Sequence, residues 1–265
     1  MFEVDVAKQV NLSREMGWFF VTIRKDSLNT ANCQEHYRYS KSQEMFCVDK
    51  LSFPAQQSNL RLSARTPQEY YAAHQFVAAH LPYQDVNTAI NEILSAHERG
   101  ASIFTLGNGG SAALASHFAC DLGKGTLVHH KSKKRFRVIS LTDNVPLITA
   151  WANDHGYEHV FAEQLENLVD SDDVVFAISG SGNSPNVLRA LEVAKNHRAR
   201  TIGLTGFEGG KMKSLCDVCV ILPSDNMEVI EDFHLSMTHA TSSVIRRRMF
   251  EGAPVQRIAA TVMAD

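Results

Sequence analysis

The sequence predicts an α/β protein with a doubly wound parallel sheet, and two observations lead to that fold class. From residue 66 onward, short segments rich in β-branched residues alternate with segments of helical periodicity. Such alternation implies right-handed crossovers, which place helices on both faces of a parallel sheet. Two of the expected strands also run directly into glycine- and serine-rich loops. Because ligands of such sheets bind beyond the carboxyl ends of the strands, chemistry is to be sought there.

The first expected helix begins at a capping signal. Thr66-Pro67-Gln68-Glu69 offers an N-cap residue, a proline at the first helical position and a glutamate placed to close a capping box. Helices are expected at 66–80 and 84–99, before any strand. Since these two helices have no strand of their own to cover, they either pack on the sheet or form oligomer contacts.

The rest of the chain supplies the sheet. Five strands are expected, at 102–106, 137–141, 174–179, 201–205 and 218–222. Helices are expected between and after them, at 111–122, 146–153, 158–168, 184–197, 210–215 and 227–249.

Residues 1–65 differ from this pattern. Their periodicity is weak and broken, and they are rich in Gln, Ser and Asn, with little material for a core over 52–63. We therefore expect an irregular N-terminal extension over 1–65, to which the sequence assigns no function. A single domain is expected over 66–265.

The composition excludes several classes of protein. The chain has 265 residues and a net charge of -3, from 26 Lys and Arg against 29 Asp and Glu. This balance gives no case for a nucleic-acid or membrane-surface protein, and it favours a small-molecule ligand. The apolar runs are strand-sized, so no membrane span is expected. The first residues, MFEVDVAKQV, carry acids where a secretory signal carries bases, which predicts a cytoplasmic protein.

The five cysteines are odd in number and thinly spread, which predicts reduced thiols. Cys216 and Cys219 have the spacing of a redox motif, but they run straight into Val220-Ile221-Leu222 and are typical of a buried strand. The chain has no second such pair for a zinc site.

Two loops have the composition of an anion site. Gly107-Asn108-Gly109-Gly110-Ser111 follows the first strand, and Ser179-Gly180-Ser181-Gly182-Asn183-Ser184-Pro185 follows the third. Glycine lets the backbone approach a ligand, while serine hydroxyls and free helix amides donate hydrogen bonds to an anion. Ser184 is expected as an N-cap before Pro185. Neither loop has the dinucleotide fingerprint or the Walker lysine, so no nucleotide cofactor is expected.

These residues resemble a known family. The two loops, Leu204-Thr205-Gly206 with Gly209-Gly210-Lys211, and the stretch ANDHGYEHVF at 152–161 are together similar to sugar isomerase (SIS) domains, and most to phosphoheptose isomerases. The similarity covers roughly residues 66–250. It implies the SIS fold, a five-stranded parallel sheet flanked by helices. It also implies a homotetramer with active sites completed by neighbouring subunits, and a serine loop that holds the phosphate of the sugar.

Aldose-ketose isomerisation needs a base beside the carbonyl and an acid or metal to stabilise the enediolate. His117 and Asp121, four residues apart on one expected helix, share a face. On the last helix, Asp232 and His239 are better aligned than Glu231 and His239, which lie about 80° apart around the helix axis. The residues alone do not choose between these two pairs.

The resemblance does choose. Phosphoheptose isomerases place a His and a Glu four apart on the first of these helices and a Gln and a His eight apart on the last, and some members bind zinc there. The matching positions are His117, Asp121, Glu231 and His239, where Asp121 replaces Glu and Glu231 replaces Gln. The resemblance therefore implies Asp121 or Glu231 as the base and His239 as the acid. Alternatively, all four residues are ligands of Zn²⁺ or another divalent ion.

The remaining expected site residues bind substrate rather than move protons. Thr142-Asp143-Asn144 follows the second strand and is placed to hydrogen-bond a sugar. The expected sugar- and phosphate-binding residues are Asn108, Gly109, Gly110, Ser111, Thr142, Asp143, Asn144, Ser179, Ser181, Asn183 and Ser184.

The SIS family also includes proteins that are not enzymes, and the alternative hypothesis is one of these. One branch is a scaffold that associates with the bacterial replication initiator, and residues 142–145 and 152–154 resemble it; other members are phosphosugar-sensing regulators. The scaffold branch lacks the catalytic carboxylate and the last-helix histidine, whereas Asp121 and His239 are competent in acid-base chemistry. The sequence also shows no helix-turn-helix segment. Both points favour an enzyme.

Overall fold

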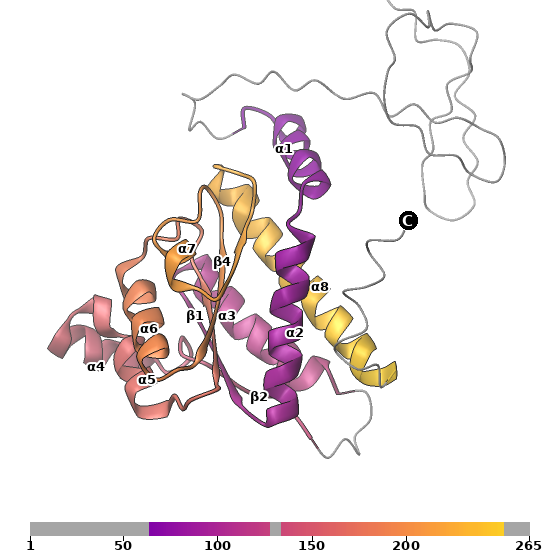
Figure 1. Cartoon of the computed structure of the whole chain (residues 1–265). Coiled ribbons are helices and arrows are strands. Elements are labelled where there is room, and N and C mark those ends of the chain that lie inside the picture. Colours follow the sequence, from indigo (N-terminus) through magenta and orange to yellow (C-terminus); the bar gives the residue numbers. More distant parts are fainter. Residues whose placement is uncertain (1–63, 128–133, 252–265) are drawn as a thin grey trace, which may run out of the picture. The chain divides into compact units, whose positions relative to one another are not determined.

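The sheet is the centre of the computed structural model, which describes residues 64–127 and 134–251 (Figure 1). Its strands are parallel and lie in the order β2-β1-β3-β4-β5. They are β1 (Ser102–Gly107), β2 (Arg137–Ser140), β3 (Val174–Ile178), β4 (Arg200–Thr205) and β5 (Val218–Ile221). Every expected strand is present, with ends that differ by at most one residue. The predicted α/β class and the five-stranded parallel sheet are confirmed.

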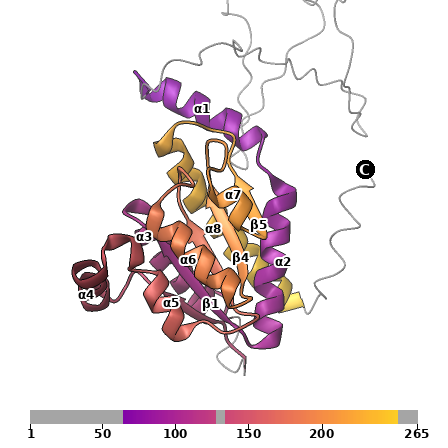
Figure 2. The ribbon, with the colours of Figure 1, turned by 60° about the vertical axis from the view of Figure 1, so that its left-hand side comes forward.

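Helices cover both faces of the sheet, as Figures 1 and 2 show. One face packs against α2, α3 and α8, and the other against α5, α6 and α7. The α-helices are α1 (Pro67–Ala79), α2 (Tyr83–Arg99), α3 (Gly110–Cys120), α4 (Val145–His155), α5 (Ala162–Leu168), α6 (Pro185–Asn196), α7 (Met212–Leu215) and α8 (Met227–Glu251). None of the helices in the described ranges is both long enough and apolar enough to cross a membrane.

The two cores follow from the two-residue period of the strands. In β3, Val174, Phe176 and Ile178 point into the core under α2, α3 and α8. The alternate residues Val175 and Ala177 point into the core under α5, α6 and α7. Both sets are buried, which explains why the central strands are apolar throughout rather than alternately polar.

Helix α1 begins where the capping signal predicts. The Thr66 hydroxyl accepts a hydrogen bond from the Glu69 amide at 3.2 Å, and Pro67 is the first helical residue. The Glu69 carboxylate accepts from the amide of Arg65 at 2.8 Å rather than from that of Thr66, so the expected capping box is shifted by one residue. Residues 1–63 of the expected extension lie outside the described residues, and the division into an extension and a domain stays a prediction.

Two expected helices are interrupted. The helix expected at 111–122 ends at Cys120 and continues as a π-helical turn, Asp121–Gly125. Two glycines in this turn weaken the α-helix, and the Thr126 hydroxyl donates to the Leu122 carbonyl at 2.6 Å. The helix expected at 158–168 is split into a 3₁₀ turn (Tyr157–His159) and α5. Single π-helical turns such as Asp121–Gly125 are frequent at functional sites.

The strand order fixes where a ligand can bind. The chain runs from β1 to β2 at one edge and returns to β3 on the other side of β1, so the order reverses between β1 and β3. Ligands of doubly wound sheets bind in the crevice beyond the carboxyl ends at that reversal. The loops that follow β1 and β3 are the two glycine-rich segments singled out in the sequence.

Candidate active site

The serine loop, residues 179–184, is a tight turn between β3 and α6. The Gly182 amide donates to the Ser179 carbonyl at 3.0 Å, and Gly182 has a φ of 64°, a region that favours glycine. The hydroxyls of Ser179 and Ser184 lie 3.1 Å apart. Ser184 occupies the N-cap position as expected, but its side chain makes no capping bond, because its hydroxyl faces Ser179 instead. The loop thus gathers hydroxyls at the start of α6.

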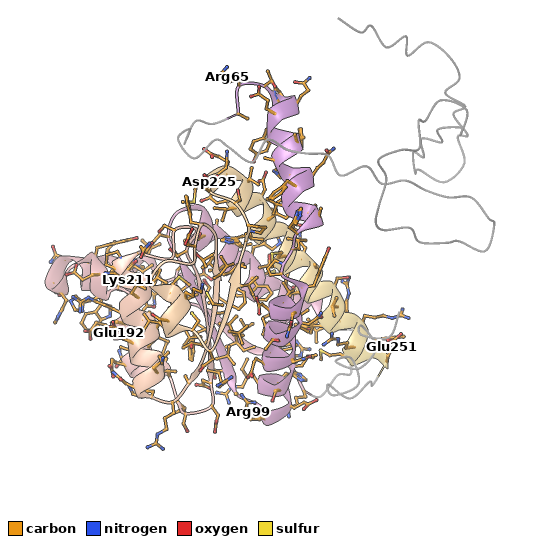
Figure 3. The ribbon with its side chains drawn as sticks, turned by 45° about the horizontal axis from the view of Figure 1, so that its top comes forward. Arg65, Arg99, Glu192, Lys211, Asp225 and Glu251 are labelled. Atoms are coloured by element: carbon orange, nitrogen blue, oxygen red, sulfur yellow. The ribbon has the colours of Figure 1, made fainter. Side chains whose placement is uncertain are left out.

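A second loop, residues 206–211, lies against the serine loop and is joined to it by hydrogen bonds. The Met212 amide donates to the Gly182 carbonyl at 3.0 Å, and the Lys211 amide donates to the side chain of Asn183 at 3.1 Å. A Cβ on Gly182 would collide with the Gly209 carbonyl oxygen. The side chain of Asn183 therefore joins two loops, and its expected contact with substrate stays a prediction. Lys211 is labelled in Figure 3.

The glycine loop after β1 is joined to the serine loop through an amide pair. The side chains of Asn108 and Asn186 exchange two hydrogen bonds of 2.8 Å, and the Tyr157 hydroxyl donates to Asn108 at 3.1 Å. Gly109 has a φ of 55° and precedes the first residue of α3. The two glycine-rich loops therefore form one connected surface at the reversal point of the sheet.

The expected acid-base residues meet where α3 and α8 pack together. His117 Nε2 lies 3.2 Å from His239 Nε2 and 3.7 Å from an Asp121 oxygen, while His239 Nε2 lies 4.0 Å from the other Asp121 oxygen. The side chains of His117, His239 and Asp121 are 47%, 50% and 26% exposed. We call these three residues the histidine-aspartate cluster. Their convergence joins residues that are 122 positions apart in the sequence.

Glu231 lies beside this cluster rather than within it. Its carboxylate oxygens lie 3.1 and 3.2 Å from the position that a Cβ of Gly110 would occupy, at the N-terminal end of α3. A negative charge there is favoured by the free amides and the dipole of the helix. Among the described residues, the group whose ligand atoms all lie within 4.8 Å of one another contains His117, Asp121 and His239 but not Glu231.

Glu231 and His117 both line a cavity of about 280 Å³, which we call the α3/α8 cavity. Its walls come from α3, between Gly110 and His117, and from α8, between Glu231 and Leu235. The lining residues are Gly110, Ser111, Ala113, Leu114, His117, Glu231, Asp232, His234 and Leu235. Burial lowers the pKa of His234 to about 4, and the Thr205 backbone opposes that shift only in part. His234 is therefore a neutral wall of the cavity at pH 7.

The polar residues after β2 have protein partners. The Asn144 side chain caps α4 by accepting from the Leu147 amide at 3.1 Å. Ser116 of α3 bonds to both Thr142, at 2.9 Å, and Asp143. Asp143 and Asn144 line a second, wider hollow, together with Ser116. Neither residue lines the α3/α8 cavity, so the structure does not bring them to the histidine-aspartate cluster.

Comparison with known proteins agrees with this geometry. A family model described as SIS domain matches residues 72–206. A phosphoheptose isomerase of Helicobacter pylori (strain P12) is 42% identical over 159 residues, which cover 60% of this chain and 81% of that protein.

The chain belongs to the SIS domain family, within its phosphoheptose isomerase branch. It is therefore a phosphosugar isomerase, and solved structures of the branch share its fold. The phosphoheptose isomerase from Neisseria gonorrhoeae is 33% identical, with a TM-score of 0.60 over 69% of this chain and 100% of that one. The one from Francisella tularensis is 29% identical, with a TM-score of 0.63 over 68% and 96%.

The residues of this phosphosugar isomerase fit a divalent metal ion at the histidine-aspartate cluster. Two imidazole nitrogens and a carboxylate are ligands that zinc prefers, and bonds of about 2.0 to 2.2 Å place tetrahedral ligand atoms roughly 3.3 Å apart. The two separations from His117 Nε2, 3.2 Å to His239 Nε2 and 3.7 Å to an Asp121 oxygen, are near that value, and one ligand atom of each residue lies within 4.8 Å of the others. In addition, two Nε2 atoms at 3.2 Å must share a proton or a cation, because two bare lone pairs repel each other.

Two residues of the isomerase site were missed from sequence. Asn186 is buried in the first turn of α6, and Tyr157 projects from the turn before α5. Both act on Asn108, which the sequence did single out. Tyr157 lies in the stretch at 152–161 that carries part of the family resemblance, and that signal pointed toward it. Asn186 directly follows Pro185 in the first turn of α6, and nothing in the sequence distinguishes it there.

Proposed function

We propose that this phosphosugar isomerase interconverts sedoheptulose 7-phosphate and a heptose 7-phosphate through an enediolate. The observation that carries the proposal is the placement of two kinds of group around one region. A hydroxyl-rich loop at a helix start, suited to phosphate, follows β3, and an acid-base cluster stands on α3 and α8 beside the α3/α8 cavity. A sugar phosphate carries both a dianion and a carbonyl with an acidic neighbouring proton.

Phosphate binding is assigned to the serine loop. The hydroxyls of Ser179, Ser181 and Ser184 donate to the phosphate oxygens, and the start of α6 adds free amides. Support comes from the backbone hydrogen bonds that hold the loop, from the Gly206 amide to the Gly180 carbonyl and from the Met212 amide to the Gly182 carbonyl. Asn108, Gly109, Gly110 and Ser111 line the path from there toward α3 and are assigned to the sugar chain. Asn183 acts by joining the two loops.

Proton transfer is assigned to the histidine-aspartate cluster. Asp121 removes a proton from C1 of the open-chain ketose, and His239 donates a proton to the oxygen on C2. The resulting enediol collapses when Asp121 gives a proton to C2 and His239 takes one from the oxygen on C1, which leaves an aldehyde at C1 and restores both residues. His117 holds His239 and Asp121 in register through its contacts with both. We prefer Asp121 to Glu231 as the base because Asp121 contacts both histidines.

A divalent ion, when bound, would polarise the sugar carbonyl and stabilise the negative charge of the enediolate. His117, Asp121 and His239 would hold it, in which case Asp121 and His239 would be ligands rather than base and acid, and Glu231, which faces the same cavity from α8, would be the base. Zn²⁺ suits this mixture of imidazole and carboxylate ligands.

We also propose that the enzyme is a cytoplasmic homotetramer whose subunits complete one another's active sites. The exposure of the histidine-aspartate cluster supports this assembly, because enediolate chemistry requires exclusion of water. Helix α4 supports it as well, since none of its residues is buried and Val145 is 62% exposed. The cytoplasmic location is supported by the five thinly spread cysteines, which fit reduced thiols.

The test is incubation of the purified full chain with sedoheptulose 7-phosphate, with and without a chelator, and with aldose formation followed by NMR. Conversion is expected, and its loss with a chelator and recovery with added Zn²⁺ would assign Asp121 and His239 to the ion and the role of the base to Glu231. Conversion that the chelator leaves unchanged would overturn the metal assignment alone. A chain that binds the sugar phosphate without converting it under either condition would contradict the isomerase assignment and favour a sugar-phosphate sensor.

A further inference from the structure

Asp232 is a second carboxylate in the α3/α8 cavity, one residue beyond Glu231. Its side chain lines the cavity and is 53% exposed. It belongs to neither the serine loop nor the histidine-aspartate cluster, and no role is yet assigned to it. Because it stands on the wall that also carries Glu231, a sugar held in this cavity lies within its reach.

Two side chains of α1 hold this carboxylate. The Tyr70 hydroxyl donates to Asp232 Oδ2 at 2.6 Å. His74 Nε2 lies 3.1 Å from the same oxygen, without completing a hydrogen bond to it. Burial, together with the bond to Asp232, raises the pKa of Tyr70 to about 12, so the phenol stays protonated and remains a donor. The short bond therefore persists over the whole physiological range of pH.

Aromatic packing fixes the two holding residues. The His74 ring lies 4.8 Å from the Tyr70 ring and 5.0 Å from the Phe233 ring, measured between centroids. Val77 is the single fully buried residue of α1, so these contacts are a large part of its attachment to α8. The carboxylate thus has a defined position, which is the requirement for a group that orients a ligand.

The second oxygen of Asp232 is left for a ligand. Both contacts from α1 are to Oδ2, and Oδ1 makes no hydrogen bond to any described residue. A carboxylate accepts hydrogen bonds and repels a phosphate, so the group that it takes is a hydroxyl. A metal is a poorer match, because Asp232 belongs to no group of three metal-ligating side chains among the described residues.

We propose that Asp232 is a substrate-binding residue whose carboxylate accepts a hydrogen bond from a hydroxyl of the open-chain sugar, with Tyr70 and His74 as its positioning residues. The inference rests on the proposed function, since it takes the sugar to occupy the α3/α8 cavity. It extends the site to α1, and neither Tyr70 nor Asp232 lies within residues 72–206, the part that matches the SIS family model.

The test separates the sugar from its phosphate. In chains that also carry Asp121→Asn to slow turnover, calorimetry gives the dissociation constants of sedoheptulose 7-phosphate and of inorganic phosphate. Asp232→Asn keeps the size of the side chain and loses its charge. It is expected to weaken sugar-phosphate binding about tenfold and to leave phosphate binding within about twofold. Tyr70→Phe is expected to weaken sugar-phosphate binding by a smaller factor, about threefold.

The matched control is Glu192→Gln, which removes an exposed carboxylate from α6 (Figure 3). It is expected to change neither constant. With Asp121 intact, Asp232→Asn is expected to raise KM more than it lowers kcat, at an unchanged melting temperature. Equal affinities for the sugar phosphate in Asp232→Asn and the control would overturn the proposal. A parallel loss of both ligands would also overturn it, by showing that Asp232 only supports the fold. Neither result depends on whether the wild-type chain turns over sedoheptulose 7-phosphate, which tests the proposed function separately.

Discussion

The serine loop and the histidine-aspartate cluster are built in opposite ways. The serine loop is held by backbone hydrogen bonds, such as those from Gly182 to Ser179 and from Met212 to Gly182, both 3.0 Å long. The cluster is formed by the tips of three side chains from two helices, each between 26% and 50% exposed. The first is a rigid receptor that is ready before a ligand arrives. The second is open, and it is completed by whatever fills the space between α3 and α8.

This difference separates binding from chemistry. Backbone amides and hydroxyls bind a phosphate without changing their protonation state, so a rigid loop is sufficient. Proton transfer needs groups that exchange protons with a substrate, and their geometry tightens when the substrate is bound. Changes in the cluster should therefore remove turnover and leave phosphate binding intact, whereas changes in the loop should weaken phosphate binding and raise KM for the sugar phosphate.

The largest effect is expected from the cluster. Asp121→Asn removes the proposed base without changing the size of the side chain, so kcat is expected to fall by about 10² to 10⁴. Binding of inorganic phosphate, measured by calorimetry, is expected to stay within about twofold of wild type, because the serine loop is intact. A retained kcat would shift the role of the base to Glu231, and Glu231→Gln is the variant to compare.

The next effect is expected from the loop. Gly182→Ala places a Cβ against the Gly209 carbonyl at a φ of 64°, so the loop must move. Phosphate binding is expected to weaken by more than about tenfold, and thermal unfolding to shift to lower temperature, since strain of this kind costs about 1 to 3 kcal/mol. Gly100→Ala is the control, because its φ is 78° but no atom lies within 4 Å of the added Cβ. Equal losses in the two variants would point to backbone strain alone.

A smaller effect is expected from His234, which lines the α3/α8 cavity and belongs to neither the serine loop nor the histidine-aspartate cluster. Burial lowers the pKa of His234 to about 4, below its ordinary value of 6.5, so the unfolded chain binds the proton more readily. The stability that His234 contributes is complete above pH 6.5 and is lost as the pH falls toward 4. Between pH 7.5 and pH 5 the loss is about 2 kcal/mol.

The measurement for His234 is the free energy of unfolding by urea at both pH values. His234→Gln does not titrate, so its stability is expected to fall less than that of wild type over this interval. Because His97, whose pKa is also lowered by burial, is present in both chains, the difference between them isolates His234. The same pH dependence in the two chains would contradict the neutral state of His234.

The smallest effect is expected at the junction of the two glycine-rich loops. Tyr157→Phe removes the bond of 3.1 Å to Asn108 but leaves the pair between Asn108 and Asn186. KM for the sugar phosphate is expected to rise about two- to threefold, with kcat unchanged. Asn186→Ala breaks the pair itself and should raise KM more. If Tyr157→Phe lowers kcat instead, Tyr157 acts in the chemical step.

The sequence predicts most of the fold because its signals are local. The β-branched segments mark all five strands, and Thr66-Pro67 marks the start of α1. The interruptions were not predicted, since the π-helical turn at Asp121–Gly125 depends on how α3 ends against its neighbours. Helical periodicity alone gives a continuous helix there.

The candidate site was predictable to a lesser degree. His117 and Asp121 share a helix, so their spacing shows that they are neighbours. The contact of His239 with both is tertiary, and only the family resemblance pointed to it. Asn183 shows that a residue type alone does not reveal which contacts its side chain makes. Its residue type suits a ligand, and that role stays a prediction, whereas no sequence pattern predicts the hydrogen bond that joins it to a neighbouring loop.

The most direct test of the central claim follows the proton that the histidine-aspartate cluster is proposed to move. Sedoheptulose 7-phosphate is incubated in deuterium oxide with wild type and with Asp121→Asn, and the heptose 7-phosphate is analysed by NMR. Wild type is expected to yield an aldose with deuterium at C2, because the base exchanges its proton with solvent in the enediolate stage. Asp121→Asn is expected to form labelled product at least about 10²-fold more slowly. An aldose formed without deuterium, or labelled product from Asp121→Asn at the wild-type rate, would contradict the account.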